Sequence, residues 1–372
     1  MAHIHYAHKC KKKQEVPPQK DFSRKLGGIA KRLPERLGDS MSILESPLKI
    51  NSIVLKNRLV FPPMGTEMAD WDGKSNERLL HYYESRAQGG FSLIIVEHSF
   101  VSQQGKASER QLSSADDSQI DGLRKIAQVI QKSGAKAVLQ INHAGAHTSR
   151  FITGEEPVSA SPITSGNGQE VSRPLSEAEI HRVVSDFVNA AVRAKKAGFD
   201  GVEIHSAHSY LLNQFYSPYF NNRRDRYGGS LSNRIRIHLE MIEAIRHQVG
   251  RDYPLFLRLG ACDYIPGGTT MEDSIAAAQE FEKAGLDVLD ISGGVYGFMV
   301  PGHTAEEGWF SDVTQELKKH ISLPVILTGG IRHLQMAEKF LENGNADLIG
   351  IGRPVYQDPS WLQKAWESWR NQ

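Results

Sequence analysis

The fold is decided by a stretch that reads G-V-E-I-H-S-A-H-S-Y, from Gly201 to Tyr210. Its first half, Gly201 to His205, is a largely apolar run of the kind that forms a buried strand. Side chains capable of chemistry follow at once, because His205, His208 and Tyr210 stand close together. A buried strand that ends in two imidazoles and a phenol is typical of an α/β barrel, where active sites form at the carboxyl ends of the strands.

Seven further runs of this kind extend along the chain, with amphipathic helical segments between them. One helix is predicted from Ser176 to Ala197, because Ser176 and Glu179 have the spacing of a capping box. Together the runs predict a (β/α)8 TIM barrel, with an N-terminal β-hairpin over Leu48 to Leu59 that turns at Asn51-Ser52. The other predicted strands are Leu59 to Met64, Ser92 to Glu97, Ala137 to Ile141, Leu255 to Leu259, Val288 to Ser292, Val325 to Thr328 and Leu348 to Gly352.

A doubly wound sheet is the alternative architecture. It requires a glycine-rich phosphate-binding turn after its first strand. The first predicted barrel strand instead continues into Phe61-Pro62-Pro63-Met64-Gly65-Thr66, which lacks that pattern. The barrel is therefore favoured, and 372 residues suit a single barrel domain.

Polar and glycine residues stand at the end of nearly every predicted strand. Because the carboxyl ends of barrel strands meet on one face, we expect a single site to collect them. The two glycine ends 329–330 and 352–353 follow the last two strands, where barrels commonly bind phosphate, and they imply a phosphorylated ligand. The predicted site residues are Pro63, Met64, Gly65, Thr66, Gln140, His205, His208, Tyr210, Arg258, Ser292, Gly293, Gly329, Gly330, Gly352 and Arg353.

Two histidines three positions apart also suit a zinc site. Such barrel sites need further histidine or carboxylate ligands, typically from a His-x-His after the first strand, and the first strand here ends in Pro-Met-Gly-Thr. A role as ordinary core histidines leaves unexplained why His205, His208 and Tyr210 share one strand end. We therefore predict no metal and assign the three side chains to hydrogen bonding and proton transfer.

Three motifs give the chain a resemblance to the Old Yellow Enzyme family of flavin-dependent reductases. They are E-I-H-S-A-H-S-Y-L-L-N-Q-F from Glu203 to Phe215, N-R-R-D-R-Y-G-G-S from Asn222 to Ser230, and N-R-I-R from Asn233 to Arg236. The resemblance covers roughly Leu44 to Trp366. It implies that the phosphorylated ligand is FMN and that NADH or NADPH reduces it. It also implies that the charged segment 222–233 is a structural loop, whose arginines we expect to form ion pairs.

The chemistry of a flavin then suggests a role for each polar residue. Arg258 would stabilise the N1–C2=O edge of the ring, which becomes electron-rich on reduction. Gln140 would satisfy the pyrimidine edge with its amide, and the backbone of Pro63 to Thr66 would approach the N5–C4=O side. His205 and His208 would hold the carbonyl oxygen of a substrate. Tyr210 would donate a proton to the carbon that becomes an enolate.

The resulting hypothesis is an FMN-dependent ene-reductase, which takes hydride from NAD(P)H and reduces the C=C of α,β-unsaturated carbonyl compounds by a ping-pong mechanism. The nearest alternative is a flavin-dependent amine or betaine dehydrogenase or demethylase on the same barrel. A proton donor such as Tyr210 favours the reductase, whereas a cage for a quaternary ammonium would favour the alternative. A third alternative is a flavin-binding barrel without catalytic activity.

Composition sets the remaining expectations. Residues 1–40 form a basic segment with ten Lys and Arg residues and four acids, which we interpret as a disordered leader or extension before the barrel domain 41–372. A net charge of +1 argues against a nucleic-acid partner, and no apolar run is long enough to span a membrane. Two cysteines, Cys10 and Cys262, suit the cytoplasm and a member of the family without an iron–sulfur cluster. A homo-oligomer is compatible with these features. The segment Ala144 to Pro174 is predicted to be a long active-site loop.

Overall fold

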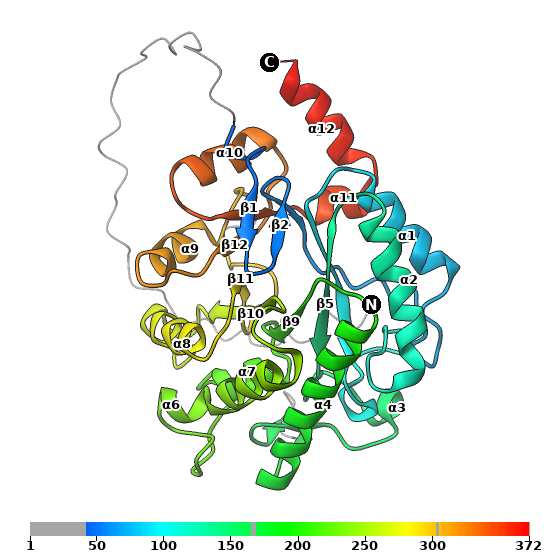
Figure 1. Cartoon of the computed structure of the whole chain (residues 1–372). Helices are drawn as coiled ribbons and strands as arrows, with labels where there is room; N and C mark the ends of the chain where they lie inside the picture. Colours follow the sequence, from blue (N-terminus) through cyan, green and yellow to red (C-terminus); the bar gives the residue numbers. More distant parts are fainter. Residues whose placement is uncertain (1–41, 165–168, 303–304, 372) are drawn as a thin grey trace, which may run out of the picture. The chain divides into compact units, whose positions relative to one another are not determined.

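Eight parallel strands close into a barrel in the computed structural model, which describes residues 42–164, 169–302 and 305–371. The predicted leader, residues 1–40, lies outside the described residues. Neighbouring strands follow the order β10-β11-β12-β13-β3-β4-β5-β9, so the predicted (β/α)8 barrel is confirmed (Figure 1). The barrel strands are β3 (Leu59–Phe61), β4 (Leu93–Phe100), β5 (Lys136–Asn142), β9 (Gly201–Ser206), β10 (Leu255–Cys262), β11 (Val288–Gly293), β12 (Val325–Thr328) and β13 (Leu348–Gly350).

Helices alternate with these strands and lie outside them (Figure 1). The predicted capping box is present, because the Ser176 hydroxyl and the Glu179 carboxylate each accept from the other's backbone N–H at the start of α4. The longer helices are α1 (Glu77–Ala87), α2 (Ile120–Gln131), α4 (Glu177–Lys196), α7 (Arg236–Val249), α8 (Met271–Lys283), α9 (Ser311–Lys318), α10 (Leu334–Glu342) and α12 (Trp361–Arg370). Shorter helices are α3 (Arg150–Thr153), α5 (Leu211–Tyr216), α6 (Leu231–Arg234) and α11 (Arg353–Gln357).

Four strand ends differ from the prediction by two residues or more. One of them is β10, which runs three residues further than predicted, to Cys262, with a shift in its pairing with β11 between Gly260 and Cys262. β3 ends at Phe61 and not at Met64, because Pro62 and Pro63 have no N–H to donate to a neighbouring strand. β13 ends at Gly350, two residues early, because the chain turns toward α11 at Gly352. β4 runs three residues further than predicted, to Phe100, and its pairing with β5 shifts between Val96 and Ser99. That irregularity directs the end of β4 toward the site described below.

The predicted hairpin is confirmed, and it closes the amino-terminal end of the barrel. β1 (Leu48–Ile50) pairs with β2 (Ile53–Leu55) across the turn Asn51-Ser52, with Asn51 at φ 49°. Ile50, Ile53 and Leu55 are buried, and they share one cluster with interior side chains of the barrel strands, among them Phe256 and Val138. Apolar side chains therefore fill this end, and polar groups gather at the other.

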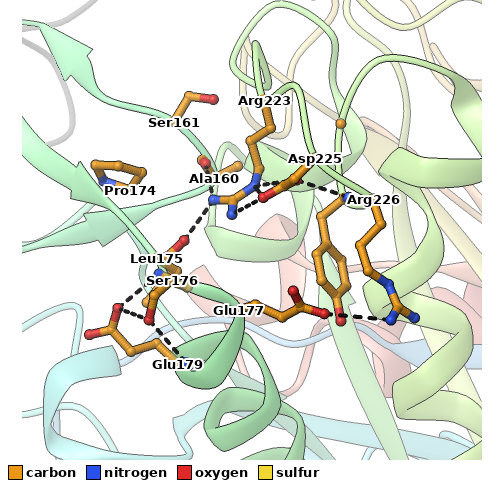
Figure 2. Close-up of polar contacts among 12 residues, drawn as sticks. Ala160, Ser161, Pro174, Leu175, Ser176, Glu177, Glu179, Arg223, Asp225 and Arg226 are labelled. Carbon is orange, nitrogen blue, oxygen red and sulfur yellow. Dashed lines mark hydrogen bonds and ion pairs between the residues drawn. The ribbon is translucent and has the colours of Figure 1, made fainter.

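The segment that follows β5 contains a small sheet of its own, formed by β6 (Val158–Ser159), β7 (Ile163–Thr164) and β8 (Glu170–Pro174). Arg223 fastens this sheet to the barrel. Its Nη1 donates to the carbonyl oxygens of Ala160 and Leu175, at 2.7 Å each, and its guanidinium pairs with Asp225 (Figure 2). Arg226 pairs with Glu177 and Glu240 nearby, and Arg234 with Asp273. The prediction that arginines of segment 222–233 form ion pairs is confirmed for Arg223 and Arg226.

Candidate active site

The predicted catalytic side chains meet at the carboxyl end of the barrel, where β9 leads into α5. The ring of His205 lies 4.9 Å from that of His208 and 5.0 Å from that of Tyr210, both measured between centroids. His205 and Tyr210 are 3% and 7% exposed, so water has little access to either side chain. The structure thus brings the three residues together as the sequence predicts, whereas their chemical roles stay predictions.

A turn at His208 and Ser209 produces this arrangement. Both residues have φ 59°, in the left-handed backbone region that residues other than glycine seldom adopt. Hydrogen bonds of both residues hold the turn. The backbone N–H of His208 donates to the Gly293 carbonyl, and the N–H of Ser209 donates to Asn213 Oδ1. Gln214 Nε2 donates to the Ser209 carbonyl, and His208 Nε2 is bonded to the Ser292 hydroxyl at 2.7 Å.

His205 presents one N–H of fixed position. Its Nδ1 accepts from the backbone N–H of Ala207 at 3.3 Å, so in the neutral ring the proton resides on Nε2. Burial holds the pKa of His205 well below its usual range, and His208, Arg258 and His98 lower that pKa further. The imidazole is therefore neutral at pH 7. It can donate a hydrogen bond through Nε2 without adding a positive charge to the site.

Tyr210 is enclosed by imidazoles. Besides His205, the rings of His98 and His147 lie 5.4 and 5.8 Å from its own. His147 belongs to the beginning of the long segment after β5, so that segment does contact the site. Burial raises the pKa of Tyr210 to about 12, and Glu67 contributes in the same direction. The phenol is therefore protonated throughout the physiological range.

A cluster of buried charges lies among the strands next to these rings. Arg258 on β10 is 4% exposed, its Nε lies 3.4 Å from Asp290 Oδ2, and its Nη2 donates a long bond of 3.5 Å to the Ser292 hydroxyl. Gln140 Nε2 donates to Glu203 at 2.8 Å. Burial raises the pKa of Asp290 to about 6 although Arg258 lowers it, and burial together with Asp290 raises the pKa of Glu203 well above its usual range.

The residues predicted after β3 lie beside β4. The backbone N–H and the hydroxyl of Thr66 both donate to the carboxylate of Glu97, which is 2% exposed. Burial raises the pKa of Glu97 to about 7 despite these bonds. Gly65 is exposed, and a Cβ at that position would lie 3.3 Å from His98 Nε2. Pro63 and Met64 precede it at the same rim of the barrel, half-buried.

The predicted phosphate corner includes an indole that the sequence did not suggest. Gly329 and Gly330 have φ 149° and 69°, and a Cβ on either would lie 2.7 Å from the side chain of Trp309. The guanidinium of Arg353 lies 4.8 Å from the centroid of the same indole. Gly352 approaches Met64, where a Cβ would lie 2.9 Å from the sulfur. The two predicted glycine ends thus meet around Trp309, with a cation beside them.

These groups fit FMN. Arg258 Nε and Nη1 and Trp309 Nε1 are buried atoms without a hydrogen-bond partner among the described residues. Buried donors of this kind are costly unless a ligand or water satisfies them. A guanidinium at the barrel centre matches the electron-rich edge of a flavin, and the glycine corner with Arg353 matches a phosphate. The described residues contain no group of three or more His, Cys, Asp or Glu side chains able to hold a metal ion.

The fold and the arrangement of the site together suit a barrel that binds a flavin. The model of the NADH:flavin oxidoreductase / NADH oxidase family matches residues 44–372, and the chain belongs to that family. The predicted resemblance is thereby confirmed, and with it a family that uses FMN and NADH or NADPH. No helix in the described parts of the chain is long and apolar enough to cross a membrane.

Known relatives of two lengths match the chain. It is 42% identical to an NADH oxidase from Thermoanaerobacter brockii over 329 residues, which are 87% of this chain and 50% of that protein. The chain therefore spans about half the length of that relative. It is 36% identical to an NADPH dehydrogenase from Geobacillus sp. (strain WCH70), with 86% of this chain and 92% of that protein covered. An old yellow enzyme homologue from Zymomonas mobilis superposes with a TM-score of 0.77 at 27% identity, over 87% of this chain and 92% of that one.

Several residues of the site were missed in the sequence. Glu203 and Asp290 are fully buried, and each interrupts an otherwise apolar strand run. A charged residue is expensive to bury without a partner, so the argument that identified Arg258 applies equally to them. Glu97 and His98 were missed because β4 was predicted to end at Glu97. Trp309 lies in a loop and gives no signal in a single sequence.

Proposed function

We propose that this protein is an FMN-dependent NAD(P)H oxidoreductase that reduces the C=C of α,β-unsaturated carbonyl compounds. One observation carries the proposal, namely the ring of His205, whose Nδ1 accepts from the backbone N–H of Ala207 and whose centroid lies 5.0 Å from that of Tyr210. A hydrogen-bond donor and a proton donor so close together suit a substrate whose oxygen must be polarised and whose carbon must then be protonated.

Each side chain would contribute a distinct step. His205 Nε2–H would donate to the substrate's carbonyl oxygen, which draws electron density away from the double bond. FMN, reduced by NADH or NADPH, would supply the hydride for the β-carbon. The Tyr210 hydroxyl would then donate a proton to the α-carbon and recover one from solvent. His208, tied to Ser292, would position the same oxygen.

Other residues would hold the cofactor. The Nη1 group of Arg258, which has no hydrogen-bond partner among the described residues, would face the electron-rich edge of the flavin, and the Gln140 amide its pyrimidine edge. The flavin ring would be bordered by backbone groups of residues 63–66 and by the carboxyl end of β11, at Ser292 and Gly293. Gly329, Gly330, Gly352 and Arg353 would bind the phosphate, with the Trp309 N–H as a further donor.

An anaerobic half-reaction experiment tests the proposal. NADPH should bleach the yellow colour of the purified protein, and cyclohexenone should restore it in a second mixing step. Bleaching by NADPH without reoxidation by any enone would refute the reductase. Bleaching by an amine or betaine, but not by NADPH, would establish the dehydrogenase alternative, and no bleaching at all would indicate a non-catalytic flavoprotein.

We also propose a cytoplasmic location, where NADH and NADPH are available, and activity without a nucleic-acid partner, which the net charge of +1 supports. A homo-oligomer is part of the same proposal. Cell fractionation and light scattering of the purified protein test these points, and a purely monomeric or membrane-associated protein would contradict them.

A further inference from the structure

A single carboxylate ties the loop after β11 to the loop after β12. It belongs to Glu307, which lies between β11 and α9 and has a side chain that is 9% exposed. Its Oε2 accepts from the backbone N–H groups of Arg332 and His333, at 2.7 and 3.1 Å. Its Oε1 lies 2.5 Å from His333 Nδ1 and 3.8 Å from Arg332 Nε. Both oxygens of the carboxylate are thus engaged by residues that directly follow the glycine pair of the predicted phosphate corner.

The short segment 307–309 holds this glycine pair on both sides. The backbone N–H groups of its last two residues donate to the Gly329 carbonyl, at 2.6 and 3.4 Å, while Glu307 accepts from the residues beyond the pair. Between these two anchors, the backbone N–H groups of Gly330 and Ile331 donate to no group in the described parts of the chain. They are donors that the corner can offer to an anion, and the anchors set their direction.

A corner built on two glycines needs such anchors because glycine is conformationally free. Gly329 and Gly330 have φ 149° and 69°, values that other residues rarely adopt. A mobile loop of this kind would lose freedom when it binds a ligand, and that loss would reduce affinity. Glu307 fixes the loop beforehand. The Arg332 guanidinium beside it offsets part of its negative charge, which would otherwise repel a phosphate nearby.

We propose that Glu307 is a positioning residue for the cofactor phosphate, which holds the Gly329-Gly330 loop in the conformation whose N–H groups bind that phosphate. This inference rests on the proposed function, which puts the phosphate of FMN at this corner. Glu307 would act through the loop and not by contact, since both of its oxygens already have partners. The effect should concern the phosphate alone. Riboflavin, the same flavin ring without a phosphate, should not depend on Glu307.

Competition between the two flavins tests the proposal on the full-length FMN-loaded protein. The protein is dialysed against mixtures of FMN and riboflavin, and the ratio of the bound flavins gives the preference for FMN. Release of fluorescent FMN on dilution gives its Kd. Glu307→Ala removes both acceptors, whereas Glu307→Gln keeps an oxygen for the two backbone N–H groups. Glu316→Ala is the matched control, because that carboxylate also pairs with a histidine and a cation but does so within its own helix, α9.

Glu307→Ala should lower the preference for FMN roughly tenfold or more, because the loop must then be ordered by the phosphate itself. Glu307→Gln should stay within about threefold of the parent and Glu316→Ala within about twofold, since the loop keeps its anchor in both. An unchanged preference in Glu307→Ala, or equal weakening of both flavins, would overturn the proposal, and the second result would indicate a merely structural role.

Arg353→Ala serves as the reference for direct contact with the phosphate. A lowered preference in Arg353→Ala but not in Glu307→Ala would refute the role of Glu307 and leave the phosphate at this corner. Should Glu307→Ala unfold, Glu307→Asp, whose shorter side chain withdraws the carboxylate, provides the same comparison. A parent protein whose preference depends on Glu307 as expected, but whose reduced flavin no enone reoxidises, would refute the proposed function and leave the role of Glu307 standing.

Discussion

Tyr210→Phe removes one hydroxyl from the site and leaves a ring of the same shape. The ring contacts with His205, His98 and His147 are kept, so the variant should fold and hold flavin as the parent does. We expect the free energy of unfolding to change by about 1 kcal/mol or less, the usual net value of a single hydrogen bond. The catalytic effect should be far larger, because solvent has little access to a carbon beside a side chain that is 7% exposed.

General acid catalysis by a positioned side chain contributes roughly 100-fold to 10,000-fold. Loss of Tyr210 should therefore slow enone reduction by that factor, which corresponds to about 2.7 to 5.5 kcal/mol in the barrier. The pKa of about 12 adds a pH signature. A phenol with a raised pKa stays protonated until the pH nears that value, so its contribution should be constant from roughly pH 6 to 9 and should fall only as the pH rises toward 12.

Stopped-flow oxidation of the reduced protein separates the donor from a packing role. With cyclohexenone the variant should be slowed by the factor given above. With a quinone it should react nearly as the parent does, because the oxygens of a reduced quinone take protons from solvent. The reasoning is wrong if cyclohexenone reacts at the parent's rate, or if both acceptors slow equally.

Three other experiments examine separate parts of the molecule. His205→Ala or His208→Ala should weaken phenol binding and slow the oxidative half-reaction on the order of tenfold to a thousandfold, with less effect on reduction by NADPH, and stoichiometric zinc in the protein would contradict the assignment. Arg353→Ala should lose FMN on gel filtration, and full retention, or a preference for FAD, would move the phosphate elsewhere. Arg223→Ala should lower the free energy of unfolding in urea by roughly 3 kcal/mol, since two hydrogen bonds from a charged group are lost. The neighbouring Arg224→Ala should cost no more than about 0.5 kcal/mol, and equal losses would discount the fastening role.

The barrel was predictable because its strands are buried on both faces and so read as apolar runs that need no tertiary information. Strand ends were less predictable. Pro62 and Pro63 end β3 because they have no N–H group to donate, and this end could have been predicted from the two prolines in the sequence. The extension of β4 to Phe100 depends on a shift in its pairing with β5, which no local pattern reports. That shift is why His98 escaped notice.

The candidate site was predictable where polar side chains directly follow a strand in the sequence. It was less predictable where the contacting residues belong to different strands or loops. His205, His208 and Tyr210 share one short stretch and were found together. The pairing of Gln140 with Glu203 joins two strands, and the packing of Trp309 on Gly329 and Gly330 joins two loops. Such contacts depend on distances across the barrel. The one signal for Glu203 and Asp290 was a charged residue inside an apolar strand run, because such a charge is costly to bury without a partner.

The turn at His208 and Ser209 has a consequence for attempts to make this protein more robust. Two successive side chains in the left-handed region cost on the order of 1 to 3 kcal/mol each, and the bonds from Asn213, Gln214 and Gly293 hold them there. Glycine at 209 would relieve part of this cost, so a screen for heat resistance would tend to select it. The same change would loosen the turn that joins β9 to Tyr210. Variants chosen for survival at high temperature and variants chosen for turnover should therefore diverge first at this turn.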